Sequence, residues 1–138
     1  MDRPKIELKL PVIANMELVA VQTAEVVAKH MDLSEYKAAE ISMALIEACI
    51  NAFEHSQAQN NVFIHFILEE NSLVIKVIDQ GIGFDKAKVE IPAIENKLGT
   101  DERKRGWGLQ LIQELMDSVE FESGKDGTTV TMTKNKKV

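Results

Sequence analysis

The chain has 138 residues, of which 45% are apolar and 28% are charged, with a formal net charge of -6. This length predicts one domain, residues 1–138, that is large enough to bury a core. The acidic balance gives no electrostatic support for direct nucleic-acid binding. No charged-then-apolar leader begins the chain and no apolar run approaches membrane-spanning length, so we expect a cytoplasmic protein without a membrane segment. The single cysteine, Cys49, lies in an apolar stretch and is expected to be a small core residue.

The N-terminal half predicts one strand followed by two helices. Residues 6–10 alternate between apolar and charged side chains, as in a half-buried strand. Asn15 is expected to cap a helix over 16–31, whose apolar residues recur at steps of three or four. Ser34 is expected to cap a second helix that continues to about Ser56.

The second helix carries a polar stripe beside its apolar face. Glu47, Asn51 and His55 are spaced i, i+4, i+8, so they line up on one side of a helix. A carboxylate with an amide oxygen one turn later suits the holding of a hard cation and the orientation of a nucleophile. A solvated helix edge is an equally good interpretation of this stretch taken alone.

The C-terminal half predicts strands with a charged loop and a short helix between them. Lys134, Lys136 and Lys137 are expected to form a frayed, solubilising tail. The order of elements predicts an α+β sandwich of two layers, with helices on one face of a mostly antiparallel sheet. The expected elements are strands over 62–68 and 73–78, a mobile loop over 86–104, a helix from about Leu109, and strands over 119–123 and 128–133.

Two glycine-rich segments have the composition of ligand-binding turns. Asp79-Gln-Gly81-Ile-Gly83 follows a strand, and a carboxylate fixed there can accept a hydrogen bond from an exocyclic amine such as that of adenine. Arg105-Gly106-Trp107-Gly108 precedes a helix, where free N–H groups and an arginine suit phosphate. A plain turn and a glycine-rich linker are the alternatives for each segment alone. Neither segment matches a P-loop or the GxGxxG pattern.

Taken together and in this order, the motifs resemble the GHKL family of ATP-binding domains, which have the Bergerat fold. The helix with Glu47 and Asn51 matches the N box of that family, Asp79 to Gly83 matches the G1 box, and Arg105 to Leu109 matches the G2 box. Gly127-Thr128-Thr129 matches the closing Gly-Thr element. Within the family, the chain is most similar to the stand-alone anti-sigma-factor serine kinases, from which Trp107 departs, because a small or aliphatic residue is usual there.

The resemblance implies a Mg²⁺- and ATP-dependent serine/threonine protein kinase. Glu47 would be the catalytic residue that orients or deprotonates the acceptor serine, and Asn51 would give an oxygen to Mg²⁺. Asp79 would bind the adenine amine with support from Thr129. The other implied nucleotide-binding residues are Gly81, Gly83, Arg105, Gly106, Gly108 and Leu109, with residues 86–104 as the lid.

The resemblance also implies the partners. The kinase would sequester a sigma factor, phosphorylate a serine of a small anti-anti-sigma protein, and form a homodimer, with partner contacts on the first strand and first helix. Three alternatives remain at this point. They are a nucleotide-dependent binding module without kinase chemistry, a partner-switching kinase with a target other than a sigma factor, and a histidine-kinase catalytic domain from a longer protein. Glu47 argues against the first, because a pure binder needs no acid there.

Overall fold

A computed structural model of the chain describes residues 3–56, 61–79, 109–124 and 127–137. Residues 109–115 are helical. No helix in these ranges is long and apolar enough to cross a membrane. The other elements, in chain order, are β1 (Lys5–Pro11), α1 (Glu17–His30), α2 (Glu35–His55), β2 (Asn61–Leu68), β3 (Ser72–Asp79), β4 (Ser118–Gly124) and β5 (Gly127–Asn135).

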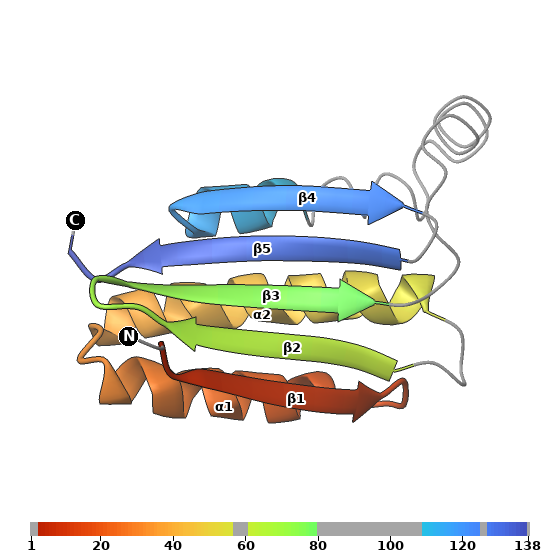
Figure 1. The fold of residues 1–138 in the computed structure, drawn as a ribbon, viewed down its shortest axis with the longest axis horizontal. Coiled ribbons are helices and arrows are strands. Elements are labelled where there is room, and N and C mark those ends of the chain that lie inside the picture. The colour runs from red at the N-terminus through yellow and green to blue at the C-terminus, as the bar shows by residue number, and fades with distance from the viewer. Residues whose placement is uncertain (1–2, 57–60, 80–108, 125–126, 138) are drawn as a thin grey trace.

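The five strands form one sheet in the order β1-β2-β3-β5-β4, and every neighbouring pair is antiparallel. Figure 1 shows α1, α2 and the 109–115 helix on the same side of this sheet. The two-layer α+β architecture expected from the sequence is therefore confirmed. The β5 strand enters between β3 and β4, so the last strand of the chain lies next to the centre of the sheet.

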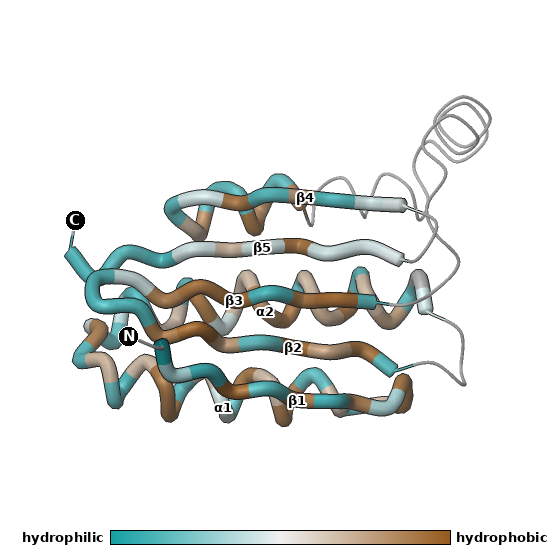
Figure 2. The backbone as a smooth tube through the Cα atoms, in the orientation of Figure 1, coloured by the Kyte–Doolittle hydropathy of each residue, from teal (hydrophilic) through white to brown (hydrophobic). Residues whose placement is uncertain are grey.

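The core lies between the sheet and its helices. Alternate residues of β2 and β3 point toward the helices, and Phe66 and Ile75 are both fully buried there. These two strands are among the most hydrophobic segments of the chain (Figure 2). From α2, Ile41 and Cys49 enter the same cluster with no exposed surface, which confirms Cys49 as a core residue. Burial raises the pKa of the Cys49 thiol to about 12, since the thiolate is poorly solvated there.

The two expected helix caps have different outcomes. Ser34 caps α2, because its hydroxyl accepts a hydrogen bond from the Lys37 backbone N–H at 3.1 Å. Asn15 does not cap α1, and that expectation is wrong. The helix begins at Glu17 after Met16, which makes no side-chain cap hydrogen bond. Asn15 instead has a φ of 75°, in the left-handed region that asparagine tolerates, so its backbone turns the chain into the helix.

Lys134 corrects the expectation of a frayed basic tail. This residue lies within β5 directly opposite Leu73, on the face of the sheet that the helices cover, and is only 5% exposed. The strand continues to Asn135, and only Lys137 of the three lysines is exposed. The burial of Lys134 could not be predicted from the sequence, because it depends on partners that are distant in the chain.

Candidate functional site

Glu47 and Asn51, two of the three residues of the expected polar stripe, lie on α2 at the edge of its buried face. Glu47 and Asn51 are both partly buried, whereas the neighbouring Ala44, Ala48 and Ala52 are buried in the core. The stripe therefore borders the core and stays accessible to a ligand. Figure 1 shows α2 running in the same direction as β3, so the C-terminal turns of α2 approach the end of the sheet where β3 terminates.

Asp79 is the last residue of β3 and is only 4% exposed. Its side chain is on the same face as those of Ile75 and Val77, because residues two apart in a strand share a face. This is the face that α2 covers. A carboxylate at such a position is held by the strand and screened from bulk water. It therefore has the fixed geometry that recognition of a single amine requires.

A pair of hydroxyl groups lies across the ladder from Asp79. Thr128 of β5 is the direct partner of Asp79 and is 8% exposed. Its Oγ1 atom lies 3.1 Å from the Oγ atom of Ser123 on β4, at hydrogen-bond distance. Both hydroxyls can donate and accept, whereas an ionised carboxylate only accepts. This end of the sheet thus gathers an acceptor and two adaptable hydroxyls from three adjacent strands.

Thr129, from which the resemblance implies support for the adenine contact, lies on the neighbouring strand β5 but does not share a face with Asp79. It pairs with Ile78 on β3 and with Glu122 on β4, so its side chain lies on the opposite face of the sheet. Sequence reasoning chose the second of two adjacent threonines and missed Thr128. Side chains alternate along a strand, so Thr128 and Thr129 lie on opposite faces of β5. Only the register of β5 with β3 shows which of the two shares a face with Asp79.

The other expected nucleotide residues fall mostly outside the described ranges. Leu109 is the first described residue of the 109–115 helix, and it is partly buried against the core. The residues and segments that lie outside are Gly81, Gly83, the 86–104 lid, Arg105, Gly106, Trp107 and Gly108.

The oxygen atoms of Glu47 and Asn51 on α2 fit a magnesium ion that is held partly by the protein and partly by the phosphates of a nucleotide. Mg²⁺ prefers oxygen donors and is usually held by one or two protein oxygens together with substrate phosphates. Asn51 offers an amide oxygen and Glu47 a carboxylate one turn earlier, both partly accessible. Among the residues that the structure describes, no group of three or more His, Cys, Asp or Glu side chains is placed to hold a metal.

A separate groove of about 460 Å³ lies at the other end of the sheet. Its lining includes His30, Leu68 and Lys136, next to the turn between β2 and β3, whereas Asp79 terminates β3 at the far end. Arg3 and Glu69 form an ion pair of 2.6 Å along this lining. The groove contains none of the residues that the sequence assigns to nucleotide or metal, so it is distinct from the candidate site.

Comparison with known proteins agrees with this architecture. Residues 13–134 match the model of a histidine kinase-like ATPase domain. The serine-protein kinases RsbW of Bacillus thuringiensis (strain Al Hakam) and Bacillus cereus (strain 03BB102) are each 35% identical to this chain over 136 residues, which is 94% of this chain and 84% of theirs.

Two solved structures share the fold at low sequence identity. The RsbU and RsbW domains of a Mycobacterium tuberculosis protein match with a TM-score of 0.69 and 19% identity, covering 95% of this chain and 32% of that one. The catalytic domain of the histidine kinase ThkA matches with a TM-score of 0.56 and 16% identity, over 99% of this chain and 98% of that one. With a family model that covers most of its length and relatives above 30% identity, the chain belongs to the histidine kinase-like ATPase domain family, as the sequence motifs predicted.

Proposed function

We propose that this protein is a Mg²⁺-ATP-dependent serine kinase of a partner-switching circuit. It sequesters a sigma factor and phosphorylates a serine of an anti-anti-sigma protein. The observation that carries the proposal is the placement of Glu47 and Asn51 on one stripe of α2, which approaches the end of the sheet where Asp79 is buried. The relatives named serine-protein kinase support the same reaction class.

The adenine end of the nucleotide is assigned to the sheet. Asp79 accepts a hydrogen bond from the exocyclic amine of adenine, and the Thr128 hydroxyl, directly across the ladder, supports that contact. A hydrogen bond to an ionised group is stronger than a neutral one, so Asp79 provides most of the base discrimination. Gly81 and Gly83, next in sequence, allow the backbone to approach the nucleotide closely.

The phosphate end is assigned to α2 and to the segment before the 109–115 helix. Asn51 would hold Mg²⁺, which would neutralise charge on the phosphates, and Arg105 with the N–H groups of Gly106 and Gly108 would bind the β- and γ-phosphates. Glu47 accepts the proton of the acceptor serine as the serine oxygen bonds to the γ-phosphorus and the bond to the ADP oxygen breaks.

The partner surfaces are assigned to the N-terminal elements. Leu18, Val19 and Val26 on α1 are 48%, 39% and 69% exposed, and apolar side chains of this size favour contact with another protein. We assign α1 and β1 to the homodimer and to the sigma factor. The protein would act in the cytoplasm, as a regulator of transcription through its protein partner and without direct contact to nucleic acid or membrane.

The test is affinity capture from the native host lysate, with and without Mg²⁺-ATP, followed by mass spectrometry. The proposal expects a sigma factor in the captured material, together with a small protein whose serine becomes phosphorylated when ATP is present. Purified kinase and partner with labelled ATP then show direct transfer. A partner that binds only with ATP but never gains phosphate would identify a binding module instead of a kinase. A captured phosphoprotein without any sigma factor would redirect the proposal to another switching circuit.

A further inference from the structure

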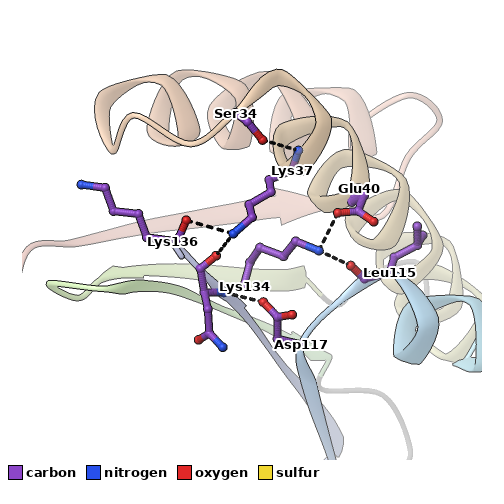
Figure 3. Close-up of polar contacts among 8 residues, drawn as sticks. Ser34, Lys37, Glu40, Leu115, Asp117, Lys134 and Lys136 are labelled. Carbon is purple, nitrogen blue, oxygen red and sulfur yellow. Dashed lines mark hydrogen bonds and ion pairs between the residues drawn. The ribbon is translucent and has the colours of Figure 1, made fainter. Parts of the chain in front are cut away.

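A buried lysine joins three elements at the end of the sheet opposite Asp79. The Nζ atom of Lys134 on β5 lies 2.7 Å from Oε1 of Glu40 on α2 and donates a hydrogen bond to the backbone carbonyl of Leu115, at the end of the 109–115 helix. Figure 3 shows the ammonium group between these two acceptors. We call Lys134, Glu40 and the Leu115 carbonyl the lysine junction.

The ammonium group in this junction is expensive to bury. The Lys134 side chain is 6% exposed and that of Glu40 is 21% exposed, so both charges have lost most of their water. The desolvation energy of a buried ion pair is often only partly offset by the electrostatic attraction between the two charges. A pair of apolar side chains of similar volume is often as stable. Stability alone therefore does not explain a lysine here. A lysine that contacts three elements can in addition fix their relative position.

The junction holds the C-terminal end of the 109–115 helix. The last carbonyls of a helix lack partners within the helix, and a cation near them also complements the helix dipole. Just beyond the helix, the Asp117 N–H donates to the Thr133 carbonyl at 2.9 Å, and Asp117 Oδ2 accepts the Asn135 N–H at 2.6 Å. This end of the helix is thus tied to β5 on several sides.

The helix that is held in this way continues directly from the expected phosphate-binding segment. Leu109, its first described residue, follows Arg105–Gly108 in the sequence. Seven helical residues form a rod about 10 Å long that does not bend easily. A rotation of its fixed end would therefore displace the other end, which adjoins the phosphate-binding segment.

Glu40 connects the same junction to the catalytic stripe of α2. Glu47 is seven residues further and Asn51 eleven, so at 3.6 residues per turn both lie within about 20° of Glu40 around the helix axis. Lys134 therefore contacts the same side of α2 that carries Glu47 and Asn51. A single ammonium group thus contacts both α2 and the end of the 109–115 helix.

We propose that Lys134 is a positioning residue that fixes the 109–115 helix against α2, and thereby aligns the nucleotide phosphates with Glu47 and Asn51. This inference rests on the proposed kinase function. It adds a residue that touches neither nucleotide nor acceptor serine, at the opposite end of the sheet from the adenine-binding carboxylate.

Lys134→Met is the test variant, and Lys37→Met is its matched control. Lys37 of α2 donates to the backbone carbonyls of Asn135 at 2.8 Å and Lys136 at 2.9 Å (Figure 3). It therefore joins α2 to β5 as Lys134 does, but has no hydrogen bond to the 109–115 helix among the described contacts. Calorimetry with ATP, ADP and adenosine separates the phosphate end from the base end, and phosphate transfer gives kcat and KM.

We expect Lys134→Met to lose about tenfold or more in affinity for ATP and ADP and in kcat, because small misplacements of reacting groups are costly. Its affinity for adenosine should stay within about twofold, since Asp79 and Thr128 lie at the opposite end of the β3–β5 ladder from Lys134. Lys37→Met should keep all of these values. Equal loss for ATP and adenosine in Lys134→Met, or the same ATP loss in Lys37→Met, would overturn the inference.

The double variant E40L/K134M keeps the test decisive if the single variant does not fold. It replaces the ion pair with apolar side chains, which should restore the free energy of unfolding. A purely structural lysine predicts that ATP affinity returns with stability. A positioning lysine predicts a stable protein whose ATP affinity and kcat remain low while adenosine still binds. If the wild-type protein binds no ATP at all, the proposed function itself is wrong, which distinguishes that failure from a failure of this inference.

Discussion

Asp79 and Thr128 face each other directly across the β3–β5 ladder, on the buried side of the sheet. The Asp79 carboxylate and the Thr128 hydroxyl are thus neighbours on the same buried face. The Ser123 hydroxyl lies 3.1 Å from that of Thr128. The residues proposed to recognise the base therefore lie on the sheet. Asn51 and Glu47, which are proposed to contact Mg²⁺ and the acceptor serine, lie on α2. Variants in the sheet and in α2 should therefore have separable effects.

Asp79→Asn should weaken ATP binding while leaving the fold intact. The amide keeps nearly the same volume but loses the negative charge, so a charge-assisted hydrogen bond to adenine worth about 1.5–3 kcal/mol is lost. Titration calorimetry of the two proteins with Mg²⁺-ATP measures the difference, and circular dichroism checks the fold. Equal ATP affinity in the variant would contradict the role of Asp79.

Thr128→Val should weaken nucleotide binding more than Thr129→Val. Both changes replace a hydroxyl with a methyl group of the same shape, but only Thr128 shares a face with Asp79. The loss at Thr128 should be about 0.5–1.5 kcal/mol, as for one neutral hydrogen bond. Thr129→Val is the matched control on the outer face, where a β-branched apolar residue suits a strand. The reverse order of effects in an ATP titration would return the assignment to Thr129.

Glu47→Gln and Asn51→Ala should separate catalysis from binding. Glu47→Gln keeps the helix and its volume, so ATP and partner binding should survive, while phosphate transfer falls by roughly 10²–10⁴-fold because the proton acceptor is lost. Asn51→Ala removes the proposed Mg²⁺ ligand, so both nucleotide affinity and turnover should fall, with partial recovery in added Mg²⁺. Labelled phosphate transfer beside native gels of partner binding reports both. A wild-type transfer rate in Glu47→Gln would refute the assignment of the base.

Cys49 should make the stability of the protein fall with alkaline pH. Burial raises its pKa from 9.0 to about 12 in the folded chain. The stabilisation is therefore fully present below pH 9 and is lost as pH rises toward 12, by at most about 1.4 kcal/mol per pH unit. Urea unfolding of the wild type and Cys49→Ala between pH 8 and 10.5 measures this, with the alanine variant as the control. Parallel pH profiles of the two proteins would show that Cys49 ionises equally in both states.

Local sequence pattern was sufficient for the elements and for the family. The apolar steps from Ile41 to Phe53 predict α2 with its polar stripe, because side-chain direction in a helix depends only on the spacing of residues along it. Ser34 was recognised as a cap for the same reason, since its partner is three residues away. The motifs around Asp79 and Asn51 were recognisable because each occupies a few consecutive residues.

The tertiary structure alone decided which distant residues meet. Thr128 and Thr129 are adjacent and chemically identical, and only the register of β5 against β3 places one of them opposite Asp79. Likewise, Lys134 resembles a tail residue until the fold brings Glu40, which is 94 positions earlier, within 2.7 Å of it. Strand register and buried ion pairs are set by the packing of the whole core, in which a shift of one residue would turn each strand's apolar face to water. No local period contains that information.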